Sequence, residues 1–169
     1  LAGQRPGEGG GGVGGGGGGG GRGGAGGGGV GVCPVGPLTN IAIALQRDPE
    51  LVKHVKSVVI MGGAGFVPGN VTDYAEANIW NDPHAADIVF AADWEVVMIG
   101  LDVTTQVMCM PEEYQSIADA SGKIGAFIND ISKFYTRFYA TIYHEEVCVL
   151  HDPSAVIAIR APELFEYRT

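Results

Sequence analysis

Residues 57–61 read Ser-Val-Val-Ile-Met, and two glycines follow them. A continuous β-branched run of this length is typical of a strand that is buried on both faces of a sheet. Residues 95–100, Glu-Val-Val-Met-Ile-Gly, repeat the pattern, and residues 30–35 can form a third strand. Strands of this kind occur in parallel sheets that helices cover, so the three runs predict an α/β fold.

Helical patterns alternate with these strands along the chain. Most of them begin with a proline, which is tolerated in the first turn of a helix because the N–H it lacks would have no partner there. The helix predicted over residues 123–143 carries apolar side chains along one face. The predicted helix starts are Pro37, Pro49, Pro83, Pro111, Lys123 and Pro153.

This alternation predicts a mainly parallel, Rossmann-like open sheet flanked by helices and incomplete at both ends. The order of its strands stays open. Ligands of such sheets collect beyond the carboxyl ends of the strands. The prediction therefore places residues 35–36, the loop over residues 62–75 and the loop after Gly100 on one rim.

Glycine is distributed very unevenly, since 22 of the 29 glycines lie in residues 1–36. Residues 9–31 are almost pure glycine, without the Gly-X-Y period of collagen or the fixed glycine spacing of a phosphate-binding loop. Such a segment has little to bury and much conformational entropy to lose. We therefore predict a disordered tail over residues 1–31 and a folded domain over residues 32–169, and one hypothesis is that the tail is artefactual sequence read in a wrong frame.

The composition restricts the partners and the compartment. The net charge of −9 comes almost entirely from the part after residue 36, which argues against nucleic acid or an anionic membrane as the main partner. Cys33, Cys109 and Cys148 are odd in number and widely spaced, which predicts reduced thiols and a cytoplasmic protein. No apolar run reaches the roughly 18 residues that a membrane span needs.

Six segments, taken in order, resemble the inosine–uridine-preferring nucleoside hydrolase family. Together they cover the chain from about Val32 to its end. They are residues 34–42 (PVGPLTNIA), 58–64 (VVIMGGA), 69–70 (GN), 75–86 (AEANIWNDPHAA), 100–104 (GLDVT) and 150–156 (LHDPSAV).

The resemblance implies hydrolysis of the N-glycosidic bond of ribonucleosides to ribose and a free base. It also implies a calcium cofactor, a small-molecule ribonucleoside as the partner, and a homo-oligomer. By position, Val35 (backbone carbonyl) and Asp152 match calcium ligands, and His151 matches a histidine near the leaving base. The residues that match ribose contacts are Met61, Asn70, Glu76 and Asn78.

The residue types suit this chemistry. N-glycoside cleavage passes through an oxocarbenium-like state, so carboxylates are expected to face the developing positive charge. Calcium prefers about 6–8 oxygen ligands and can hold ribose hydroxyls and a water together. An imidazole that titrates near neutrality can assist proton delivery to the base.

One part of the family pattern has no match in the sequence. The family opens with a strand that ends in an Asp-rich motif, whereas the first aspartate here is Asp48. A frame error or misjoined exon, a truncated relative and a fragment are the explanations, and we favour the first. The sequence as written therefore predicts no hydrolase activity. The alternative is a non-catalytic relative that binds nucleosides weakly or acts only as an assembly partner.

Each candidate also has a structural interpretation that needs no ligand. Asp152 before Pro153 is typical of a helix N-cap, and Glu76 and Asn78 lie in a polar stretch where solvated side chains are the default. Asn70 suits a turn, and Met61 suits the core. The functional interpretation rests on the match of all these residues to one family pattern. Base preference, purine or pyrimidine, stays open.

Overall fold

The computed structural model describes residues 29–168. The disorder predicted for the glycine-rich segment therefore lies, up to residue 28, outside the described residues. Within them, three parallel strands form one sheet in the order β1-β2-β3, with β2 at its centre. The strands are β1 (Val30–Val32), β2 (Val55–Met61) and β3 (Val96–Ile99).

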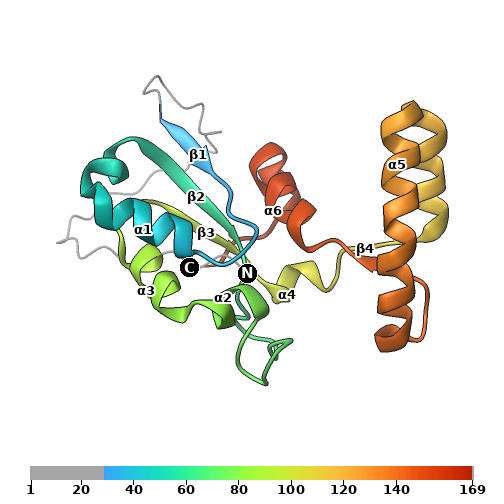
Figure 1. Cartoon of the computed structure of the whole chain (residues 1–169), viewed down its shortest axis with the longest axis horizontal. Helices are drawn as coiled ribbons and strands as arrows, with labels where there is room; N and C mark the ends of the chain where they lie inside the picture. Colours follow the sequence, from blue (N-terminus) through green and yellow to red (C-terminus); the bar gives the residue numbers. More distant parts are fainter. Residues whose placement is uncertain (1–28, 169) are drawn as a thin grey trace, which may run out of the picture.

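Helices cover both faces of this sheet, as predicted (Figure 1). On one face α1 packs against α3, and on the other α6 packs against β2 and β3. This three-layer arrangement is the α/β fold that the alternating pattern indicated. The elements around the sheet are α1 (Thr39–Arg47), η1 (Pro49–Lys53), α2 (Ala77–Asn81), α3 (Pro83–Ala91), α4 (Leu101–Thr104), α6 (His151–Arg160) and η2 (Pro162–Leu164).

The central strand is buried on both faces, which explains its continuous apolar run. Val58 and Ile60 belong to the core under α1 and α3. Val59 and Met61 belong to a second core under α6. Because successive side chains of a strand point to opposite faces, an uninterrupted run of apolar residues fills both cores.

A helical arm projects from this body. Helix α5 (Pro111–Tyr143) is a hairpin, because Gly122 in its middle has φ 57° and ψ −134° and breaks the helix into two limbs. The arm joins the body through an antiparallel ribbon of β4 (Met108–Cys109) and β5 (Cys148–Val149). In Figure 1 it stands apart from the sheet and its helices. In residues 29–168 no helix is long and apolar enough to cross a membrane.

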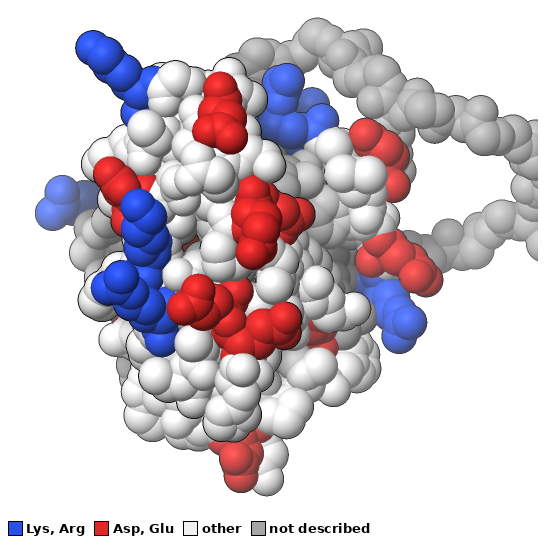
Figure 2. All heavy atoms as spheres, turned by 90° about the vertical axis from the view of Figure 1, so that its right-hand side faces the viewer, with Lys and Arg blue, Asp and Glu red and all other residues white. Residues whose placement is uncertain are grey.

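The apolar face predicted for residues 123–143 lies largely at the surface of this arm. Small and polar side chains, Gly125, Ser132 and Thr136, are the buried ones on this limb. Figure 2 looks onto the arm side and shows acidic and basic side chains separated by broad uncharged areas. The large exposed side chains of the limb include Ile124, Phe127, Ile131, Phe134, Tyr135, Phe138 and Ile142.

Several predicted boundaries shift. The first strand ends at Val32 instead of residue 35, and α1 begins at Thr39, two residues after the expected proline, because its first helical carbonyl is that of Leu38. The segment after Asp48 is a 3-10 helix. The start at Pro83 is confirmed, and the Asp82 side chain caps it by accepting from the Ala85 N–H.

Candidate functional site

The loop over residues 62–76 leaves the carboxyl end of β2 through a glycine that no other residue replaces easily. Gly63 has a φ of 86°, and a Cβ there would lie 2.6 Å from the Met98 sulfur. Its carbonyl accepts a hydrogen bond from the Leu101 N–H at 2.9 Å, which extends the contact between β2 and β3. The loop therefore begins at a fixed point on the rim of the sheet.

Glu76 closes this loop from its other end. The side chain is 2% exposed, and its Oε2 accepts hydrogen bonds from the Gly63 N–H at 2.9 Å and the Ile79 N–H at 3.2 Å. The second bond makes Glu76 the N-cap of α2. The interpretation of Glu76 as a solvated loop residue is therefore wrong, because backbone donors hold the carboxylate inside the rim. Both bonds use Oε2, and Oε1 accepts no hydrogen bond within residues 29–168.

The other residues that match ribose contacts lie around Glu76. The Asn78 amide donates to the Met61 carbonyl at 3.0 Å and contacts the Met61 sulfur at 3.4 Å. Asn70 accepts from the Ala77 N–H at 2.9 Å, so its side chain ties the loop to α2. The structure thus places four of the predicted residues close together around the carboxyl end of β2: Met61, Asn70, Glu76 and Asn78.

His151 begins α6 and has partners on both ring nitrogens. Its Nδ1 lies 2.7 Å from the Thr104 hydroxyl, and its Nε2 lies 3.0 Å from the Tyr139 hydroxyl. Burial lowers the pKa of His151, while the nearby Asp152 and Glu76 carboxylates act in the opposite direction. Burial is also the main reason why the pKa of Tyr139 rises to about 12. The imidazole is therefore held neutral and oriented at neutral pH.

Sequence reasoning missed both partners of His151. Thr104 lies in the segment quoted for the family resemblance but had no assigned role, and it is fully buried. Tyr139 lies in α5, in a helix that the sequence treats only as an amphipathic pattern. No local signal marks Tyr139, because its contact with His151 depends on how the arm folds back along the β4–β5 ribbon.

Asp152 lies within the first turn of α6, and the N-cap of that helix is Leu150. The interpretation of Asp152 as a cap is therefore wrong. Burial is the main cause that raises its pKa; the His151 charge lowers it, and the Glu76 carboxylate raises it. Burial and the Asp152 carboxylate together raise the pKa of the Cys33 thiol. Asp152 therefore lies near Glu76 and near the end of β1, which leads into Val35.

These groups alone do not fit a calcium ion. Calcium prefers about 6–8 oxygens, whereas the resemblance assigns only the Val35 carbonyl and the Asp152 carboxylate here. Among residues 29–168 no group of three or more His, Cys, Asp or Glu side chains is arranged to hold a metal. The described residues can contribute ligands to a calcium site, but they do not complete one.

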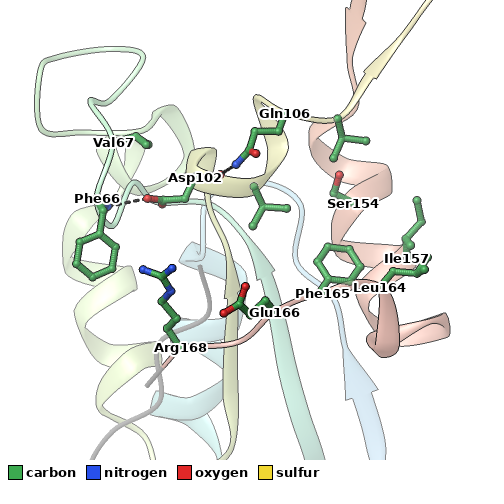
Figure 3. Close-up of a pocket in the computed structure, with 12 residues that line it drawn as sticks. Phe66, Val67, Asp102, Gln106, Ser154, Ile157, Leu164, Phe165, Glu166 and Arg168 are labelled. Carbon is green, nitrogen blue, oxygen red and sulfur yellow. Dashed lines mark hydrogen bonds between the residues drawn. The ribbon is translucent and has the colours of Figure 1, made fainter.

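A cavity beside this site is lined by none of the residues that the sequence predicted (Figure 3). It has a volume of about 670 Å³ between the loop after β2, α4, α6 and the segment after η2. Glu76 instead lines a cavity of about 390 Å³ between the loop, α2 and α3. The titratable groups Glu76, His151 and Asp152 lie outside the 670 Å³ cavity and are brought together by hydrogen bonding and charge. Asp102, to which the sequence analysis gave no role, lines the larger cavity.

Solved structures show the same fold in proteins of known activity. A plant nucleoside hydrolase aligns with a TM-score of 0.77 and 36% identity over 81% of this chain and 43% of its own. The purine-preferring ribonucleoside hydrolase of Gardnerella vaginalis aligns with a TM-score of 0.76 and 43% identity over 80% of this chain and 43% of its own.

The relatives found by sequence are likewise nucleosidases or nucleoside hydrolases by name. The probable uridine nucleosidase 2 of Oryza sativa is 41% identical over 81% of this chain and 41% of its own length. The inosine-uridine preferring nucleoside hydrolase of Crithidia fasciculata is 40% identical over 78% of this chain and 41% of its own. The chain thus spans about two fifths of the length of these relatives. The family model for inosine-uridine preferring nucleoside hydrolases matches residues 24–169, and the chain belongs to that family.

Proposed function

We propose that this chain binds ribonucleosides and takes part in the hydrolysis of their N-glycosidic bond to ribose and a free base. The observation that carries the proposal is the buried Glu76 carboxylate, which backbone N–H groups hold on the rim beside Asn78 and Met61. A buried carboxylate with one oxygen left for a ligand suits a sugar hydroxyl and a developing positive charge. The relatives named above act on uridine, inosine or purine nucleosides, so the proposed substrate class is the ribonucleosides.

In this proposal the ribose lies over the end of β2. The free Oε1 of Glu76 and the amides of Asn70 and Asn78 contact its hydroxyls, and Met61 lines the pocket. Because Glu76 and Asn78 are already oriented by other hydrogen bonds, little conformational entropy is lost when the sugar binds. The Glu76 carboxylate also faces the positive charge that develops on the sugar ring as the base leaves.

His151 serves the other half of the reaction, the departure of the base. Thr104 and Tyr139 hold the two ring nitrogens, which fixes the orientation of the imidazole. An oriented imidazole can relay a proton toward the base as the bond to the sugar breaks: one ring nitrogen releases its proton while the other takes one from the Tyr139 hydroxyl, so the ring stays neutral. Tyr139 carries that proton at neutral pH because burial raises its pKa to about 12.

A bound calcium ion would supply Lewis-acid assistance in this chemistry. Since the described residues supply only the Val35 carbonyl and Asp152 toward the ion, we propose that this chain by itself releases no base. The alternative is a non-catalytic relative that binds nucleosides weakly or acts as an assembly partner. The three cysteines are free thiols, and we propose a cytoplasmic, homo-oligomeric protein.

The test measures binding and base release separately. We expect calorimetry to show that uridine or inosine binds the chain, and that Asn78→Ala weakens binding about tenfold. Asn129→Ala in the arm, whose side chain contacts Gln115, is the matched control and is expected to leave binding unchanged. Absence of binding in the unmodified chain would refute the ribose site.

Base release is measured with inosine and uridine, with added calcium and with a chelator. We expect none from this chain. Base release that the chelator abolishes would refute the proposed inactivity of this chain. Stabilisation by calcium alone would point to a metal site and away from the non-catalytic alternative, because a ligand that binds only the folded state raises the melting temperature.

A further inference from the structure

Asp102 is a buried acidic side chain to which the proposed function gives no part. It lies in the first turn of α4 and is 6% exposed. Its two carboxylate oxygens accept hydrogen bonds from consecutive backbone N–H groups, Gly65 to Oδ2 and Phe66 to Oδ1, both at 2.7 Å. Hydrogen bonds to a carboxylate of this length are stronger than those between neutral groups.

These bonds hold the first part of the ribose-facing loop. Figure 3 shows the Asp102 carboxylate turned toward the backbone of Phe66 across the edge of the larger cavity. The two segments approach closely, since a Cβ on Gly100 would lie 2.8 Å from the Gly63 carbonyl oxygen and 3.2 Å from Asp102 Oδ2. The other side-chain bonds of the loop, from Asn70, Thr72 and Glu76, connect it to itself or to α2. Asp102 instead connects it to the end of β3.

The same short turn also reaches the other half of the site. Thr104, two residues after Asp102, contacts the His151 ring at 2.7 Å. One end of α4 therefore contacts the loop that carries Asn70, and the other end contacts the residue that faces the base. A side chain that only completed the core of this turn would not need a carboxylate, because an apolar residue could fill the same space.

We propose that Asp102 is a positioning residue: its carboxylate holds residues 62–70 in the conformation that presents Asn70 and Glu76 to a ribose. This inference rests on the proposed function. Without the carboxylate, the Gly65 and Phe66 N–H groups lose their partner and the loop samples conformations that do not bind sugar. The apparent affinity then falls in proportion to the fraction of molecules that remain competent.

The experiment compares Asp102→Asn and Asp102→Ala with Asp93→Asn, a change of an exposed aspartate elsewhere on the surface. Asn keeps the volume and one acceptor, whereas Ala removes both. Amide hydrogen exchange is measured for Gly65, Phe66 and the β2 residues 58–60, together with uridine affinity by calorimetry. We expect the two loop amides to exchange about tenfold faster in Asp102→Asn, with β2 unchanged and uridine affinity about tenfold weaker. Asp102→Ala should exceed Asp102→Asn in both effects.

The outcomes separate this inference from the proposed function. Unchanged exchange at Gly65 and Phe66 in Asp102→Asn overturns the positioning role, and so does an equal increase throughout β2, because that would be a general loss of stability. A loosened loop with uridine affinity unchanged from that of the unmodified chain overturns it as well. If the unmodified chain binds no uridine and the loop is nevertheless loosened in Asp102→Asn, the result supports the positioning role of Asp102 and refutes the proposed ribose site instead.

Discussion

The α/β body and the α5 arm bury their apolar residues in opposite ways. In the body, Leu38, Val58, Ile60 and Val89 are fully buried between the sheet and its helices. In the arm, Phe134 is 74% exposed and Ile124 is 72% exposed, while small or polar side chains lie between the two limbs. The two parts therefore depend on different forces. Hydrophobic burial stabilises the body, whereas close backbone approach and the β4–β5 ribbon define the arm.

The largest effect should come from the core of the body. Replacing Ile60 with Ala leaves a cavity between β2 and the helices, and we expect a loss of about 2–5 kcal/mol in the free energy of unfolding. The matched change in the arm, Phe134→Ala, should alter it by less than about 0.5 kcal/mol because that side chain is exposed. Urea denaturation measures both. Similar losses for the two variants would show that the apolar face of the arm is covered by another surface.

A smaller effect should come from the contact between the two limbs of the arm. A Cβ on Gly125 would lie 2.3 Å from the Ile117 carbonyl oxygen and 2.9 Å from the Ala118 Cα. Gly125→Ala should therefore push the limbs apart and cost about 1–3 kcal/mol. Hydrogen exchange should increase in residues 111–143 and stay unchanged in β2. Ala126→Ser on the exposed side of the same turn is the control, and equal exchange in both variants would contradict a tightly packed hairpin.

The smallest expected effect concerns the contact between the arm and the body. Tyr139→Phe removes one hydroxyl from His151 and should cost about 0.5–1.5 kcal/mol, the net value of an ordinary hydrogen bond. The raised pKa of Tyr139, about 12, gives a pH signature. The folded state keeps this proton above the ordinary tyrosine pKa of about 10. Its contribution to stability is complete below pH 10 and is lost as the pH rises toward 12.

Ultraviolet titration of the tyrosinates checks this assignment, because one late-titrating phenol near pH 12 should disappear in Tyr139→Phe. Tyr135→Phe, which changes an exposed ring of the same helix, is the control and should leave that late phase in place. A late phase near pH 12 that persists in Tyr139→Phe would show that Tyr139 is not the phenol whose pKa burial raises.

The two regions also differ in how well their sequences predict them. The parallel sheet and the start of α3 at Pro83 follow from local patterns, because a doubly buried strand needs continuous apolar residues and a helix start needs a capping side chain. The helix over residues 123–143 is confirmed, and the break at Gly122 agrees with the separate helix starts predicted at Pro111 and Lys123. Helical periodicity indicates an apolar face without indicating what covers it.

For the site, the sequence determined which residue types stand at the rim, and the family pattern selected Glu76, Asn78 and His151 among them. The tertiary structure decided how they are held. Glu76 accepts one of its two hydrogen bonds from Gly63, 13 residues away, and His151 lies against Tyr139 and Thr104, which are 12 and 47 residues away. Asp102 contacts a loop 36 residues earlier in the chain. Such contacts leave no periodic trace in a sequence, because they depend on how the strands and the arm pack in three dimensions.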